Sequence, residues 1–210
     1  MTTRVKNRLV AKKPAANYWR VYFGIGLIGI ALAGGLLYWA FGRSKSVDTL
    51  AADLAGSNPH LRKVAARELS ALGPNSRAAL PQLTVALKDP DKRVRHATAK
   101  TLSELGLEAQ PAAKALIDAL AEPEADTRYY VVKALSKVDL SKDHVDAVPG
   151  LIRLLKDPNP KVRYYAAKCL KDIGPAARAA IPALKAAAED ANTETKDQVV
   201  AALQKVSRAK

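Results

Sequence analysis

The sequence predicts an all-α fold, a right-handed α-solenoid of helix pairs preceded by one transmembrane helix. Two observations carry this prediction. The stretch 21–42, "VYFGIGLIGIALAGGLLYWAFG", contains no charged residue. After it, a similar sequence motif with a helical pattern repeats every 33 to 35 residues, and self-similarity at such a period is typical of solenoids.

The apolar stretch is long enough for a membrane span. As a helix it would measure about 33 Å, and a bilayer core is about 30 Å thick. Six of the eight basic residues in 1–46 precede it, which predicts a cytoplasmic N-terminus and a repeat domain on the far side, the periplasm in a bacterial inner membrane. A cleaved signal peptide fits less well, because the run exceeds about 15 residues and no A-x-A site follows. Aromatic residues at the two ends of the stretch predict the membrane interfaces: Tyr18, Trp19, Tyr38 and Trp39.

The net charge of +14 is unevenly distributed along the chain. Residues 1–46 hold eight bases and no acid, whereas the rest holds 26 bases and 20 acids, an excess of only 6. The N-terminal arm therefore suits anionic lipid headgroups, and no nucleic acid is expected on the repeat domain. We expect four parts: a basic cytoplasmic tail (1–20), the span (21–42), a short linker (43–46) and the repeat domain (47–210).

The repeat domain contains five copies of one phrase, of which "TRYYVVKAL" (127–135) and "VRYYAAKCL" (162–170) are two. Each copy predicts a first helix, such as 91–105, and most are followed by a second, such as 111–121. Residues 47–55 match a second helix alone, so we expect about four and a half repeats with 47–55 as a cap. Glycines in the left-handed conformation are expected to end three first helices. The first helices share a leucine column: Leu69, Leu102, Leu135, Leu170 and Leu203.

Two segments carry a more specific pattern, "DPDKRVRHATAKTLSELG" and "DPNPKVRYYAAKCLKDIGPAARAAIPALKAAAED". They resemble HEAT-like repeats of the phycobilisome-lyase type, in which D-P-x-x-x-V-R-x-x-A-A-x-x-L is followed by G-P and A-I-P-x-L. The resemblance covers residues 47–210 and implies the solenoid fold. The third copy departs from it, because "VDLSKDHVDAVPG" replaces the G-P turn and adds two residues. Such repeats occur in lyases, scaffolds and structural subunits, so the resemblance implies no single activity.

A basic residue near the start of each first helix follows an acid by six residues, except in the first copy, where Gly56 precedes Arg62. On a helical wheel Arg62 falls on the same face as the leucine column and so points toward the core. A buried guanidinium needs a partner of opposite charge. We expect a structural ladder of acid–base pairs at the turns between units, which the resemblance also implies; an anion-binding row is the alternative. The members are Asp89, Arg95, Glu122, Arg128, Asp157, Arg163, Asp190 and Lys196.

The repeat domain has four aromatic residues, which form two doublets. Two interpretations fit: the rings fill the seam between units, or they form a partner-binding patch, since tyrosine is enriched at interfaces. Arg153, on the small and mixed exposed side of a second helix, is a further candidate contact. The doublets are Tyr129, Tyr130, Tyr164 and Tyr165.

The sequence lacks the usual constellations for catalysis. His60, His96 and His144 show no metal-ligand spacing, and Cys169 has no base placed to activate it. There is no P-loop and no G-x-G-x-x-G motif. We therefore expect no enzyme, no metal and no cofactor.

These features lead to one main functional hypothesis and two alternatives. The main hypothesis is a non-enzymatic, membrane-anchored HEAT-repeat scaffold, an accessory or structural subunit of a larger membrane protein complex. Its solenoid surface would dock partners, and its span would contact other membrane subunits. The alternatives are a chromophore lyase or isomerase, which the resemblance implies, and a binder of anionic lipid or nucleic acid.

Overall fold

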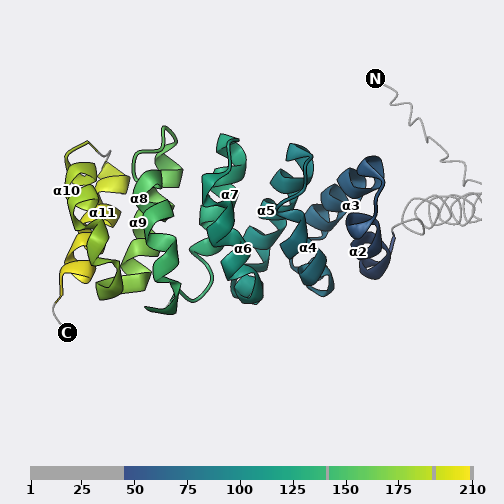
Figure 1. The fold of residues 1–210 in the computed structure, drawn as a ribbon, viewed down its shortest axis with the longest axis horizontal. Helices are drawn as coiled ribbons and strands as arrows, with labels where there is room; N and C mark the ends of the chain where they lie inside the picture. The colour runs from purple at the N-terminus through teal and green to yellow at the C-terminus, as the bar shows by residue number, and fades with distance from the viewer. Residues whose placement is uncertain (1–44, 141, 191–192, 209–210) are drawn as a thin grey trace, which may run out of the picture. The chain divides into compact units, whose positions relative to one another are not determined.

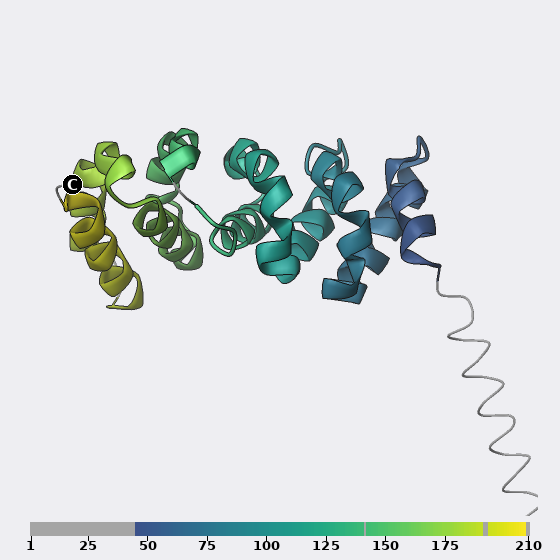
Figure 2. The ribbon, with the colours of Figure 1, turned by 90° about the horizontal axis from the view of Figure 1, so that it is seen from below.

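The computed structural model describes residues 45–140, 142–190 and 193–208. Every regular element in these residues is helical, as the sequence predicts. The part from Ser46 to Lys210 is a compact unit of its own. Its helices follow one another as a row of pairs, which Figure 1 and Figure 2 show from two directions at right angles.

The helices fall into two sets that alternate along the chain. The short-helix layer consists of α2 (Val47–Ala55), α4 (Leu80–Ala86), α6 (Ala113–Asp118), α8 (Val148–Leu154) and α10 (Ile181–Asp190). The long-helix layer consists of α3 (Pro59–Leu72), α5 (Lys92–Leu105), α7 (Ala125–Leu135), α9 (Pro160–Ile173) and α11 (Thr193–Ser207). Five 3-10 segments complete the described part: η1 (Gly73–Ala79), η2 (Gly106–Ala112), η3 (Ala119–Ala121), η4 (Lys142–Ala147) and η5 (Gly174–Ala180).

Each pair begins with a short helix and continues, after a tight turn, with a long one. In this way α2 lies against α3 and α4 against α5, and the same holds to the end of the described chain. The sequence assigned residues 47–55 to a lone cap; instead, α2 is the first member of the first pair. The described residues therefore hold five pairs rather than four and a half. The reason is that the short turn, and not the longer 3-10 link, joins the helices that pack together.

Local sequence signals account for the ends of the long helices. Asn58, Asp91 and Asn159 cap α3, α5 and α9, each accepting a hydrogen bond from the N–H two residues on, at 2.8–2.9 Å. Gly106, which follows α5, has the positive φ expected at a helix end, 62°. Its ψ of −127° lies outside the left-handed helical region, in a part of conformational space that only glycine enters readily.

The core lies between the two layers and consists mainly of leucine. Four members of the predicted column are fully buried, and the fifth, Leu203, is half-buried. The short helices contribute a matching set of fully buried leucines: Leu83, Leu116, Leu151 and Leu184. The long helices also contact their neighbours in the layer, α3 with α5, α5 with α7, α7 with α9 and α9 with α11. Side chains on the free side of these helices thus form one surface across several units.

The expectation of a single-pass membrane protein is corrected. No helix in the described part of the chain is long and apolar enough to cross a membrane. The predicted tail, span and interface aromatics, residues 1–42, lie outside the described residues.

Candidate partner-binding surface

Three arginines of the ladder column, Arg62, Arg95 and Arg128, each join two successive turns. Arg95 donates from Nη1 to the carbonyl oxygens of Asp89 and Pro90 in its own turn, at 3.0 and 3.2 Å. Its Nε and Nη2 donate to the carboxylate of Glu122, in the turn of the next unit, at 2.8–3.0 Å. The guanidinium therefore bridges neighbouring units while satisfying carbonyl groups that the tight turn leaves without partners.

This geometry corrects the expected pairing. The acid six residues before each arginine offers its backbone carbonyl, and its carboxylate faces the previous unit. Arg62 accordingly binds Asp89 at 2.7 Å, and Arg128 binds Asp157 at 2.8 Å. Arg163 donates to the Asp157 and Pro158 carbonyls in the same way. Of the last expected pair, Lys196 is exposed, and the side chain of Asp190 lies outside the described residues.

The ion pair of Arg95 and Glu122 includes a second acidic residue. Glu124 accepts from Nη2 of Arg95 at 2.9 Å, so two carboxylates share one guanidinium. Burial raises the pKa of Glu122, against the opposing effect of Arg95. The pKa of Glu124 is lowered, first by a hydrogen bond with Glu122 and then by Arg95. Because Arg62, Arg95 and Arg128 have carboxylate partners within the chain, they do not form a vacant anion-binding row.

The two tyrosine doublets form a continuous row of rings across α7 and α9. The ring centroids of Tyr129 and Tyr165, one from each helix, lie 5.9 Å apart. Within each doublet the rings meet edge to face, at 4.9 Å for Tyr129 and Tyr130 and 5.2 Å for Tyr164 and Tyr165. The His96 ring of α5 extends the row, 5.2 Å from Tyr130. We call these five rings the aromatic row.

The aromatic row fills a seam and also reaches the surface. Its tyrosines are all half-buried. Burial is the main reason that the pKa of Tyr165 is raised. Lys133 lies over the rings of Tyr129 and Tyr130, at 5.4 and 5.8 Å from their centroids. Arg153, the other predicted contact, is exposed on α8 in the short-helix layer, so the structure does not bring it into the row.

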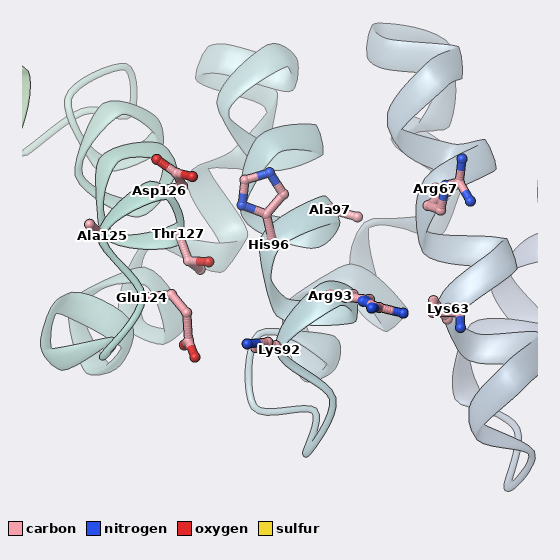
Figure 3. Close-up of a pocket in the computed structure, with 10 residues that line it drawn as sticks. All are labelled: Lys63, Arg67, Lys92, Arg93, His96, Ala97, Glu124, Ala125, Asp126 and Thr127. Carbon is pink, nitrogen blue, oxygen red and sulfur yellow. The ribbon is translucent and has the colours of Figure 1, made fainter.

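A pocket of about 710 Å³ lies beside the aromatic row, between the first turns of α5 and α7 and the middle of α3 (Figure 3). His96 lies between its two sides in Figure 3, so the pocket and the row share this ring. The lining consists of Lys63 and Arg67 from α3, Lys92, Arg93, His96 and Ala97 from α5, and Glu124, Ala125, Asp126 and Thr127 at the start of α7. We call it the α3–α5–α7 pocket.

The two sides of the pocket have opposite charges. Among the described residues, no ion pair engages any of the four basic side chains on the α3 and α5 side. Across the pocket, Glu124 is engaged by Arg95, whereas Asp126 has no ion pair within the described part. A ligand with negative charge would therefore meet unneutralised cations on one side only.

The sequence analysis did not predict this pocket, although aligning the repeats of the chain with one another gives a signal for it. Lys63 and His96 each follow a ladder arginine directly, and so do Tyr129 and Tyr164. Residues in that position share one surface of the stacked long helices. The basic side chains of the first two units and the rings of the next two are therefore parts of a single surface.

The described residues offer little for covalent or metal chemistry. Cys169 is fully buried, with Sγ 3.8 Å from the Val132 carbonyl oxygen. Burial raises the pKa of this thiol far above its usual range, so it stays protonated. No group of three His, Cys, Asp or Glu side chains in this part of the chain could hold a metal ion. The surface is suited to ionic and apolar contact.

Comparison with known proteins places this geometry among helical repeats. A family model described as HEAT repeats matches residues 47–136 and 113–204. No curated protein matches the chain.

Solved structures of repeat proteins resemble the fold. A computationally designed armadillo repeat protein for modular peptide recognition shares 17% identity over 74% of this chain and 79% of its own, with a TM-score of 0.65. A designed armadillo repeat protein in complex with the peptide (KR)4 shares 17% over 75% and 80%, with a TM-score of 0.63. The complex of CpcE and CpcF of phycocyanin lyase from Nostoc shares 23% over 79% and 66%, with a TM-score of 0.59.

Proposed function

The chain belongs to the HEAT repeat family, and from that premise we propose that it is a non-enzymatic scaffold that binds a protein partner through its long-helix layer. The observation that carries the proposal is the continuity of the aromatic row with the α3–α5–α7 pocket. Tyrosine and arginine, which this surface presents together, are residue types that protein interfaces favour. We propose that the protein serves as an accessory or structural subunit of a larger complex.

The similar structures support a role in binding. One of them was designed for peptide recognition, another is in complex with a peptide, and the third is a complex of two proteins. At 17–23% identity this likeness shows the fold alone. It supports our proposal because repeat folds present extended surfaces on which a partner can lie across several units.

The alternative of a chromophore lyase has only the likeness of fold in its favour. The one cysteine, Cys169, is buried within α9 and protonated, so it offers no thiol for attachment chemistry. We therefore do not propose an enzyme.

Affinity purification of the tagged full chain, followed by mass spectrometry, tests the proposal. Tyr164→Ser removes the ring at the outer end of the aromatic row, which contacts only Tyr165 among the rings. Val85→Ser is the matched control, because Val85 is 75% exposed on α4 in the other layer. We expect a stoichiometric protein partner that is retained by the control and lost or weakened by Tyr164→Ser. A chain that purifies alone, or a partner equally sensitive to both changes, would contradict the proposal.

A further inference from the structure

We propose that the α3–α5–α7 pocket is the docking site for an acidic, extended segment of the partner protein, with its carboxylates held against the α3 and α5 side. This inference rests on the proposed function and names the chemistry of the partner. The charges of the pocket are the first argument. Lys63, Arg67, Lys92 and Arg93 gather around one concavity, and no acid in the described chain neutralises them.

The arrangement of these cations suits carboxylates on a peptide. Arg93 from α5 and Lys63 from α3 both line the basic side of the pocket (Figure 3). An arginine fork can bind both oxygens of a carboxylate, and the neighbouring lysine adds a second positive charge. Lys63 and His96 are half-buried in the lining, whereas Arg93 is exposed.

The aromatic row sets the length of the segment. Neighbouring packed helices lie about 8–10 Å apart, so the basic side between α3 and α5 is about 16–20 Å from the seam between α7 and α9. An extended chain covers this distance with about five or six residues, at about 3.3 Å each. A segment whose acidic residues enter the pocket can therefore place an apolar or aromatic side chain on Tyr129 and Tyr165.

A nucleic acid fits this surface less well than a peptide. The basic side of the pocket is faced by Glu124 and Asp126, which would repel a phosphate backbone that continued along the helices. Beyond them the surface changes to tyrosine. Only a ligand that combines a local cluster of acids with an uncharged continuation matches both parts.

Peptide binding to the full chain tests this inference. The probe is a fluorescein-labelled peptide of about 12 residues, about 40 Å when extended, with two central Glu residues in a Gly-Ser background and a Phe about five residues to either side. A second peptide carries Lys in place of Glu. The protein variants are Lys63→Gln with Arg93→Gln, and a control that removes two exposed charges elsewhere, Lys156→Gln with Lys185→Gln. Basic residues in the N-terminal arm are common to both variants and cancel in the comparison.

We expect the Glu peptide to bind more tightly than the Lys peptide. The pocket variant should weaken it about five- to tenfold while the control leaves it unchanged, and added salt should weaken binding further. Equal affinity of the two variants, or of the two peptides, would overturn the inference. Random duplex DNA is the competitor in a further arm. If DNA displaces the labelled peptide at a lower concentration than the unlabelled Glu peptide does, and the pocket variant loses this DNA binding, the pocket is a phosphate site and the inference is overturned as well.

Affinity purification of the tagged full chain distinguishes failure of this inference from failure of the proposed scaffold function. A partner that is lost with Tyr164→Ser but retained by the Lys63 and Arg93 variant leaves the scaffold proposal intact and removes the acidic segment. Loss of the same partner from both variants, with the Lys156 and Lys185 control unaffected, is the result expected if both are right.

Discussion

Arg95 holds the middle of the array together because its guanidinium has four partners in two turns. It binds two carbonyls of the turn before α5 and two carboxylates of the turn before α7. Its side chain is only 17% exposed and that of Glu122 only 7%, so solvent screens this pair weakly. Removing Arg95 would leave the Glu122 carboxylate buried without its cation, whereas Arg95 without Glu122 would keep Glu124 as a partner.

We expect Arg95→Ala to lower the free energy of unfolding by about 2–4 kcal/mol, because the Glu122 carboxylate stays buried without its cation. Glu122→Gln should cost less, about 1 kcal/mol, since Glu124 still neutralises Arg95. Urea denaturation measures both. The control is Arg77→Ala, which breaks the exposed pair with Glu108 and should change stability by less than about 0.5 kcal/mol. Equal effects of Arg95→Ala and Arg77→Ala would show that the bridge between units contributes little.

Tyr165 provides a test by pH. Burial, followed by the neighbouring Tyr129, raises the pKa of its phenol above the usual value of about 10. The folded protein therefore favours the neutral ring, and the stability that this contributes is complete below about pH 10 and is lost as the pH rises through the folded-state pKa. Titration of tyrosinate absorbance should show a late component that disappears in Tyr165→Phe. An unchanged titration curve in that variant would contradict this assignment.

The long helices end in two different ways, and the difference follows the sequence. After α3, α5 and α9 a glycine with positive φ turns the chain into a 3-10 link. After α7 no glycine follows, Ser136 remains helical in conformation, and the link to α8 is longer. Lys137 and Lys168 each donate to a serine carbonyl at the end of the preceding long helix, Ser103 and Ser136. Such contacts neutralise the negative end of a helix with a charge from the next unit.

Gly106→Ala tests the requirement for glycine. A Cβ at this position would meet nothing within 4 Å, so the expected cost arises from the backbone alone, at φ 62° and ψ −127°. We expect a loss of about 1–2 kcal/mol in the free energy of unfolding. Leu107→Ala is the control, since that side chain is 65% exposed in the same link and should change stability by less than about 0.5 kcal/mol. No difference between the two variants would mean that the link relaxes to another conformation.

The helices and their buried columns were predictable from sequence, because each leucine repeats at a helical period within its unit and at a fixed spacing between units. The sequence did not predict which two successive helices form a packed pair, because a period of 33 to 35 residues allows a pair to begin at either helix. The partner of Arg95 was mistaken for the same reason, since spacing along the chain does not say which unit a carboxylate faces. The repeat columns place the basic side chains and the rings on one surface, but the α3–α5–α7 pocket needs three helices at once, so its concave shape comes only from the structure.

In the array of five pairs, consecutive long helices of the described chain pack on one another. A linear array of this kind has a stability close to the sum of its units and of their interfaces. The ladder pairs, the lysine contacts between units and the aromatic row all lie at such interfaces. A partner that spans α3 to α9 would therefore stabilise several interfaces at once, by mass action on the folded array.

The same architecture predicts that damage stays local. Leu102 is fully buried in α5, and Leu102→Ala should cost about 2–5 kcal/mol through lost contacts and a cavity. Because units contact only their neighbours, hydrogen exchange should lose protection in α3 to α7 while α10 and α11 keep theirs. Leu184→Ala in α10 is the mirror control and should reverse the pattern. Uniform loss of protection along the chain in both variants would mean that the described units unfold as one, and that binding at the pocket cannot be separated from the stability of the last pair.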